Sequence, residues 1–373
     1  MSEIRKAALV VQGGGQKGAF SAGVLDQFKQ QHFNPFSYYL GTSAGALNIA
    51  AFIAGQTGLA LDFILNYTTN QRFFDFNKFV QKDQHMDLDW AFQFIERGEF
   101  PLDIEKGKAF LETPYLGQNR EALACITHVE ELKDYYYPIF SDKWFDVLKA
   151  TSAIPVLYFD DIEFDGATWV DGGVTSTIPV EEAYRRGATE LVVITTEPIT
   201  NEVVEKAKPP SPTLTQLSLE VETGLELLIQ KYGLVGHVDK LTEFQRQFVK
   251  GIDQLKQDYP SLSFSSSNKS WVPEAERLVS LIKEQSIKHN FKGDGSKKME
   301  MLVSHYLNHE IAKEFMIEPP EEVSIHEISP LTPLSSKGLL SNKDDILSDY
   351  QQGALAGKEF ILKQIQSNSV LMR

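Results

Sequence analysis

The chain has 373 residues, 42% hydrophobic and 23% charged, so it can bury one large core or two smaller ones. Its formal net charge of −15 opposes contact with the phosphates of nucleic acid. The single cysteine, Cys125, excludes an intramolecular disulfide and a cysteine-based zinc site, and fits a reducing compartment.

The apolar runs are short. Residues 7–11 form a run too brief for a signal peptide, and no stretch approaches the roughly 20 apolar residues of a membrane-spanning helix. The acidic balance also argues against docking on anionic lipid through a basic patch. We therefore expect a soluble cytoplasmic protein, whose membrane contacts, if peripheral ones exist, depend on apolar side chains.

In the first half, apolar runs alternate with helical patterns, which predicts a mainly parallel sheet covered by helices. Strands are expected at residues 7–11, 38–40, 124–129 and 191–195. Helices are expected at residues 19–30, 46–54, 143–152 and 180–187.

Strand signals fade after Glu197, and a proline-rich break follows at residues 209–212. Helical patterns fill the remainder, at residues 214–231, 240–256, 273–289, 297–315 and 344–366. The sequence thus predicts two units, an α/β domain at residues 5–197 and a helical extension at residues 210–373.

Aromatic side chains gather in one segment of the first domain. Eleven lie between residues 61 and 110: Phe63, Tyr67, Phe73, Phe74, Phe76, Phe79, Trp90, Phe92, Phe94, Phe100 and Phe110. Large aromatics usually fill a core, so a subdomain core is one interpretation. An apolar groove beside an active site is the other, and the two are compatible.

The pentapeptide from Gly41 to Gly45 places Ser43 between an expected strand and an expected helix. A serine on such a sharp turn needs small neighbours, because a β-carbon would collide with the adjacent backbone. Its hydroxyl then lies at the positive end of the following helix. This context predicts a nucleophilic serine.

A glycine-rich loop from Gly13 to Gly18 also follows a strand. Dinucleotide binding would require an acidic residue at the end of the next strand, where Leu40 and Gly41 stand instead. A phosphate-binding P-loop fails because Gly18, not serine or threonine, follows Lys17. Backbone N–H groups of such a loop can instead form an oxyanion hole, where each donor is worth about 3 kcal/mol.

The base for Ser43 must be a histidine or a carboxylate. None of the eight histidines lies in a glycine-flanked turn after a strand. Asp171, by contrast, ends an expected strand and precedes Gly172 and Gly173, which lets it approach another turn closely. A plain hairpin turn is the alternative for such a pattern, and it describes Asp165 followed by Gly166 well.

His305 and His309 share a face of an expected helix and could bind a metal as a pair. The zinc-protease pattern needs a glutamate directly after the first histidine, and Tyr306 occupies that position. A solvated or packed helix face is the favoured interpretation, and we expect neither a metal nor a cofactor.

These motifs, in this order, resemble the patatin-like phospholipase family, in particular bacterial members with a helical C-terminal extension. Two further segments, residues 150–155 and 177–180, look like family patterns, and the similarity covers about residues 7–195. The resemblance implies a three-layer α/β/α fold and a Ser43–Asp171 catalytic dyad. It also implies oxyanion donors at Gly13, Gly14 and Gly15, with supporting positions at Lys17, Gly18, Gly41, Gly45, Gly172 and Gly173. Gln12 and Gly173 depart from the residues common in the family, without touching a reacting group.

The expected activity is hydrolysis of a carboxylic ester in a lipid or phospholipid. A Ser-His-Asp esterase of the α/β-hydrolase type and a catalytically silent lipid-binding protein remain as alternatives.

Overall fold

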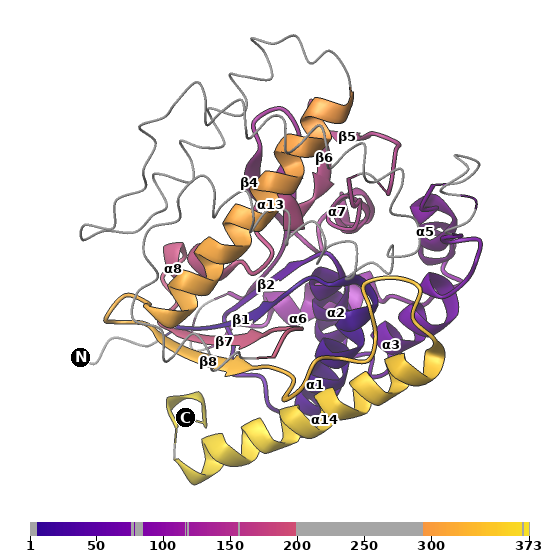
Figure 1. Ribbon diagram of the computed structural model, residues 1–373. Coiled ribbons are helices and arrows are strands. Elements are labelled where there is room, and N and C mark those ends of the chain that lie inside the picture. Colours follow the sequence, from indigo (N-terminus) through magenta and orange to yellow (C-terminus); the bar gives the residue numbers. More distant parts are fainter. Residues whose placement is uncertain are drawn as a thin grey trace, which may run out of the picture.

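One sheet of eight strands organises the part of the chain that the computed structural model describes (Figure 1). That part comprises residues 6–75, 78, 85–115, 117, 119–155, 157–198, 294–367 and 369–372. The strands are β1 (Ala7–Val11), β2 (Tyr38–Thr42), β3 (Glu121–His128), β4 (Lys133–Pro138), β5 (Ile162–Phe164), β6 (Ala167–Asp171), β7 (Glu190–Ile194) and β8 (Ser324–Ile328).

Nine α-helices surround this sheet among the described residues. They are α1 (Gly18–Gln30), α2 (Ala44–Ile53), α3 (Leu59–Phe63), α5 (Leu88–Glu96), α6 (Ile104–Glu112), α7 (Trp144–Ala150), α8 (Val180–Arg185), α13 (Asp294–Ile317) and α14 (Lys343–Gln366). Short helical turns occur at η1 (Gly15–Lys17), η2 (Ile64–Thr68), η3 (Gly172–Val174) and η4 (Val370–Met372). The strands and helices predicted in the first half are confirmed, with ends that differ by a few residues.

The strands β3, β2, β1, β7 and β8 run parallel in that order, and β4, β5 and β6 are antiparallel additions. Strand β1 is buried on both faces, as a central parallel strand must be. Its Leu9 and Val11 pack into the core formed with α1, α2 and α14, whereas Ala8 and Val10 pack toward α8 and α13. The predicted three-layer α/β/α fold is therefore confirmed.

The C-terminal region supplies both helices and a strand. Helices α13 and α14 confirm the predictions at residues 297–315 and 344–366, and the helices expected at 214–231, 240–256 and 273–289 lie outside the described residues. The expectation of an all-helical region is wrong at β8, which pairs in parallel with β7. Its five residues lie between Pro319-Pro320 and Pro330, and the open edge of β7 supplies the hydrogen bonds that stabilise them.

Helix α14 lies along α1 on one face of the sheet (Figure 1). The two backbones approach closely through glycines: a β-carbon at Gly23 would lie 2.1 Å from the carbonyl oxygen of Tyr350, and one at Gly353 would lie 2.0 Å from that of Phe20. Farther along, the ring of Phe360 packs 5.8 Å from that of Phe28. The C-terminal helix is thus part of the main core.

A buried carboxylate reinforces this contact. Asp26 on α1 accepts hydrogen bonds from the Tyr350 hydroxyl at 2.8 Å and from the backbone N–H of Gly58 at 2.9 Å. Burial raises the pKa of the Asp26 carboxyl, and the two hydrogen bonds partly offset this shift. The residue therefore ties α14 and the start of α3 to α1.

Among the described residues, no helix combines the length and the apolar content that crossing a bilayer requires.

Replacing Gly23 by alanine should destabilise the protein. Alanine favours an isolated helix over glycine by about 1 kcal/mol, but here its β-carbon meets the Tyr350 carbonyl, at an expected net cost of about 1–3 kcal/mol. The measurement is the urea midpoint of unfolding, with the exposed Gln351→Ala on α14 as the matched control. A midpoint for Gly23→Ala equal to or above that of the wild type would contradict the close packing of α1 and α14.

Candidate active site

Ser43 lies at the sharp turn between β2 and α2, the context that the sequence predicts. Its backbone has φ 54° and ψ −127°, a strained conformation for a residue with a β-carbon. Its carbonyl accepts the N–H groups of Ala46 and Leu47, which begins the helix. A β-carbon at Gly45 would lie 2.3 Å from the carbonyl oxygen of Val11, so only glycine allows the turn to pack against β1.

The glycine-rich loop lies directly against this turn. A β-carbon at Gly13 would be 3.2 Å from the β-carbon of Ser43, and Gly15 has φ 59°. The N–H of Gly13 points to the carbonyl of Thr177 at 3.4 Å. Lys17 is half-buried at the start of α1, which Gly18 opens, and Gln12 fixes the loop by accepting the N–H of Thr196 at 2.8 Å.

Asp171 is the last residue of β6 and is 6% exposed. Its side-chain Oδ1 accepts the N–H of Gly173 at 2.6 Å, and its own N–H donates to the carbonyl of Ala153 at 2.9 Å. A β-carbon at Gly172 would lie 2.2 Å from the carbonyl oxygen of Cys125, so this glycine lets the chain leave the sheet beside β3.

The register of β3 brings the ends of β2 and β6 together. Strand β4 occupies one edge of β3 at both Cys125 and Ile126. On the other edge, Thr42 of β2 is opposite Cys125, and Asp171 of β6 is opposite Ile126. Because β2 is parallel and β6 antiparallel to β3, the two strands approach each other and end at consecutive positions, about 3.3 Å apart along β3. Ser43, which follows Thr42, and Asp171 therefore lie near each other beside β3.

Buried hydroxyl groups hold this junction. Thr151 accepts the N–H of Ser43 at 2.9 Å and donates to the carbonyl of Cys125 at 2.5 Å. Thr127 is hydrogen-bonded to the carbonyl of Asp171 at 3.0 Å. The segment at residues 150–155, noted in the sequence only as a pattern, thus contacts the Ser43 turn through Thr151 and the Asp171 strand through Ala153.

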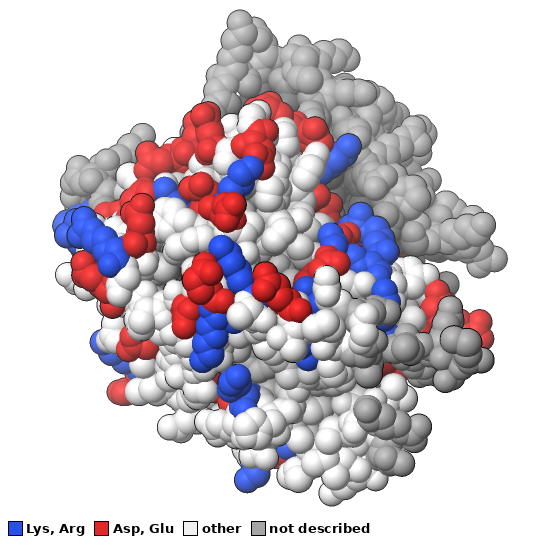
Figure 2. Space-filling model, turned by 180° about the vertical axis from the view of Figure 1, so that it is seen from behind, with Lys and Arg blue, Asp and Glu red and all other residues white. Residues whose placement is uncertain are grey.

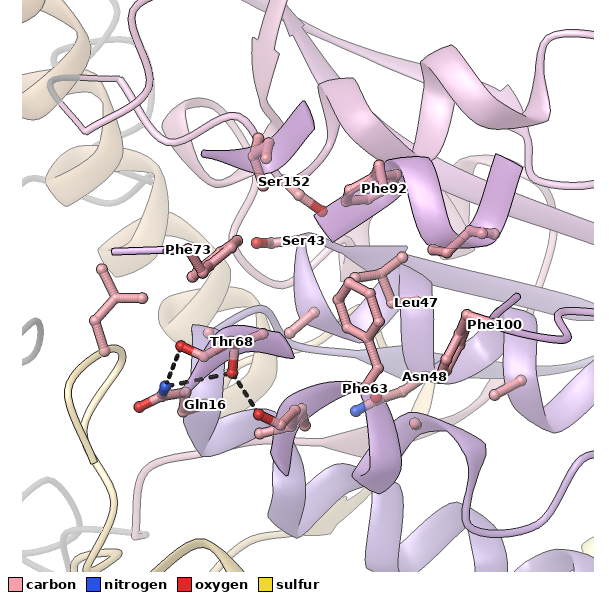
Figure 3. A pocket seen from close by; sticks show the side chains of 18 of the residues that line it. Gln16, Ser43, Leu47, Asn48, Phe63, Thr68, Phe73, Phe92, Phe100 and Ser152 are labelled. Carbon is pink, nitrogen blue, oxygen red and sulfur yellow. Dashed lines mark hydrogen bonds between the residues drawn. The ribbon is translucent and has the colours of Figure 1, made fainter. Parts of the chain in front are cut away.

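A largely apolar cavity of about 80 Å³ opens at Ser43 (Figure 3). Its lining includes Leu47, Phe63, Phe92 and Phe100, which lie on one side of Ser43, while Gln16 and Thr68 lie on the other (Figure 3). These phenylalanines also belong to the main core, so the two interpretations of the aromatic segment hold together. Phe76 and Phe79 lie outside the described residues.

A loop between β8 and α14 forms part of the cavity wall beside the glycine-rich loop. The N–H of Gln16 donates to the carbonyl of Gly338 at 2.9 Å, and the N–H of Ser341 donates to Oε1 of Gln16 at 2.8 Å. Leu339, 3% exposed, lines the cavity. The C-terminal region therefore contributes wall residues that the sequence did not associate with the site.

His305 and His309 face the turn after Asp171. Nδ1 of His305 is hydrogen-bonded to the carbonyl of Gly173, and Nδ1 of His309 is 2.8 Å from the Thr177 hydroxyl. The favoured prediction of a packed helix face is confirmed for this pair. The sequence did not indicate that the face packs against the turn after Asp171. Among the described residues, no group of three or more histidine, cysteine, aspartate or glutamate side chains could hold a metal ion, and no histidine lines the cavity.

Comparison with known proteins identifies two regions. A family model described as patatin-like phospholipase matches residues 9–184, and one described as a domain of unknown function (DUF6363) matches residues 296–368. The uncharacterized protein YjjU of Escherichia coli (strain K12) is 40% identical over 193 residues, which is 52% of this chain and 52% of that protein. The match thus spans about half the length of this curated relative.

Among solved structures, VipD from Legionella pneumophila is similar over 98% of this chain and 78% of that chain, with 13% identity and a TM-score of 0.33. A score this low supports no inference about fold or function. The family match, together with the sheet and the ordered motifs, settles the resemblance seen in the sequence: residues 9–184 of this chain are a patatin-like phospholipase domain.

Proposed function

We propose that this protein is a serine lipid acyl hydrolase in which Ser43 is the nucleophile and Asp171 the base. The proposal is carried by the junction on β3, where β2 and β6 end at consecutive positions beside the glycine-rich loop. An apolar cavity at the same serine suits a fatty acyl chain. The domain match supports the reaction class.

In the proposed reaction, the hydroxyl oxygen of Ser43 attacks the ester carbonyl while its proton passes to the Asp171 carboxylate. Backbone N–H groups of Gly14 and Gly15 in the glycine-rich loop stabilise the oxyanion, at about 3 kcal/mol per donor. Gly13, expected as a third donor, instead directs its N–H to the carbonyl of Thr177. The alcohol leaves with the proton from Asp171, and an acyl-serine ester remains. Water, deprotonated by Asp171, then releases the fatty acid and restores Ser43.

An aspartate is a weaker base than histidine in water, so this scheme depends on a dry environment. Ser43 is 7% exposed and Asp171 is 6% exposed. Desolvation raises the proton affinity of a carboxylate, which favours general base catalysis. The hydrogen bond that the N–H of Gly173 donates to Oδ1 orients the carboxylate.

The proposed substrate is a lipid or phospholipid, met at a membrane surface by peripheral contact. With a net charge of −15, apolar contacts must carry such an encounter. On the face shown in Figure 2, basic and acidic side chains of the described residues are interspersed, which fits neither a polybasic membrane patch nor a nucleic acid surface.

Ser43→Ala should abolish ester hydrolysis and labelling by a fluorophosphonate probe, because both need the hydroxyl oxygen. Asp171→Asn should be inactive in hydrolysis, because an amide cannot accept the proton. Asp165→Asn is the matched control: Asp165 also precedes a glycine, but it is hydrogen-bonded to Lys143, which holds the pKa of its carboxyl below the usual range. It should retain activity within about twofold, as expected of a surface change.

Hydrolysis of p-nitrophenyl esters and lipids, with products read by mass spectrometry, gives the measurement. Undiminished labelling of Ser43→Ala removes this serine from the scheme. Equal activities for the Asp165 and Asp171 variants remove the proposed base. Binding of fatty acid without turnover by the wild type would favour a silent lipid-binding protein.

The cavity predicts a dependence on acyl-chain length. Leu47 follows Ser43 by one helical turn and faces the cavity (Figure 3), so Leu47→Trp should fill the space that a long chain needs. Activity on a palmitoyl ester should fall by at least about tenfold, while that on a butyryl ester changes by less than about threefold. Leu362→Trp, at an exposed position of α14, should leave the chain-length profile unchanged. A proportional loss on both esters in Leu47→Trp would argue against an acyl site here.

A further inference from the structure

We propose that His305 on α13 is a positioning residue that holds the Asp171 carboxylate in its working orientation, so that the C-terminal region completes the active site. The inference rests on the proposed function of Asp171. It gives a role to a part of the chain whose matching family model has none.

The chain of contacts from His305 to Asp171 passes through one residue. Oδ1 of Asp171 accepts the N–H of Gly173, and the carbonyl of Gly173 is hydrogen-bonded to Nδ1 of His305. A carbonyl oxygen only accepts, so Nδ1 must carry a proton and donate it. The imidazole thus fixes the residue whose N–H orients the carboxylate.

The turn needs such support because two glycines follow the aspartate. Glycine leaves the backbone freer than any other residue. At Gly173 there is little room for a side chain that could stiffen it: a β-carbon there would lie 2.9 Å from Oδ1 of Asp171 and 3.8 Å from Nδ1 of His305. The carboxylate and the imidazole therefore both flank this glycine. The imidazole adds a hydrogen bond at the carbonyl of Gly173 to those that the N–H groups of Thr175 and Ser176 donate to the carbonyl of Gly172 within the turn.

Three side chains on one face of α13 contact the segment that follows Asp171. Met301, His305 and His309 follow at intervals of four residues, which places them on one side of a helix. Met301 packs with Val174 in a small buried cluster. The three side chains thus contact Val174, Gly173 and Thr177, respectively.

His309 connects α13 to the glycine-rich loop through Thr177. Its Nδ1 is 2.8 Å from the hydroxyl of Thr177, and its Nε2 lies 3.4 Å from a carboxylate oxygen of Glu197. The carbonyl of Thr177 accepts the N–H of Gly13 at 3.4 Å. Helix α13 therefore contacts the turn after Asp171 directly, and it is connected to the glycine-rich loop through Thr177.

A purely packing role for His305 makes a different prediction. If the imidazole only stabilises the fold, its loss lowers the amount of folded protein and leaves the turnover of each folded molecule unchanged. If it positions Asp171, the folded enzyme itself turns over more slowly. Because His305 does not line the cavity, substrate affinity should change little.

The test uses the full chain with p-nitrophenyl butyrate and three variants. His305→Ala should lower kcat by about 30- to 100-fold, the loss expected when a reacting group shifts by about 1 Å, with KM within about twofold. His305→Asn should recover kcat to within about fivefold of the wild type, because its amide N–H can take the place of Nδ1–H. His326→Ala is the control: it removes a histidine of the same region whose partner is Glu190, on the edge of the sheet.

Thermal unfolding and the rate of fluorophosphonate labelling, each normalised to folded protein, separate folding from turnover. A kcat for His305→Ala within about threefold of the wild type overturns the inference. So does an asparagine variant as slow as the alanine variant when both melt like the wild type. If His305→Ala does not fold, the decision passes to His305→Asn and His305→Gln: equal activity of the two refutes positioning through Nδ1, because glutamine places its N–H near Nε2.

The proposed function fails if the wild type hydrolyses no ester and Ser43→Ala is labelled as strongly as the wild type. The inference about His305 then fails with it. An active wild type with a normal His305→Ala overturns the inference alone.

Discussion

Strand β3 offers one edge to two strands that approach each other from opposite directions, and the rest of the site depends on this arrangement. Strand β2 ends opposite Cys125 and β6 ends opposite Ile126, so the segment after each strand must leave the sheet immediately. The Ser43 turn does so with a strained backbone, and the Asp171 turn does so through Gly172. The pairing of both strands with β3 thus brings two residues that are 128 positions apart in sequence (171 − 43) near each other.

Buried hydrogen bonds stabilise the place on β3 where β2 and β6 end. Where two strands end next to each other within a sheet, some backbone N–H and C=O groups lack a hydrogen-bond partner on the neighbouring strand. An unsatisfied buried group of this kind costs about 1–3 kcal/mol. Thr151 and Thr127 supply partners for the Ser43 N–H and for the Asp171 carbonyl. The same hydroxyl groups fix the two turns relative to β3, so stability and alignment have one source.

The C-terminal region belongs to this architecture, although it follows the family domain in sequence. Strand β8 extends the sheet, α14 packs on α1 through Gly23 and Gly353, and the loop at Gly338 hydrogen-bonds to the glycine-rich loop. Helix α13 covers the other face and contacts the Asp171 turn. The C-terminal region therefore contacts both faces of the sheet, the Asp171 turn and the glycine-rich loop.

By itself, the sequence determined the features that depend on local chemistry. Glycines around Ser43 predict a sharp turn because no β-carbon fits there, and the apolar runs at residues 7–11 and 191–195 predict buried strands. Helix α14 was predictable from its periodicity to within a residue at its start. The pairing of Ser43 with Asp171 came from resemblance to a family.

Only the tertiary structure decided the rest, because it depends on partners remote in sequence. The short β8 has too few residues to show a strand period against neighbouring helices, and its pairing with β7 stabilises it. His305 is an ordinary helix residue until α13 is placed over Gly173. Leu339 becomes a wall of the cavity only when its loop meets Gln16, since long-range packing, unlike local propensity, leaves no pattern in the segment itself.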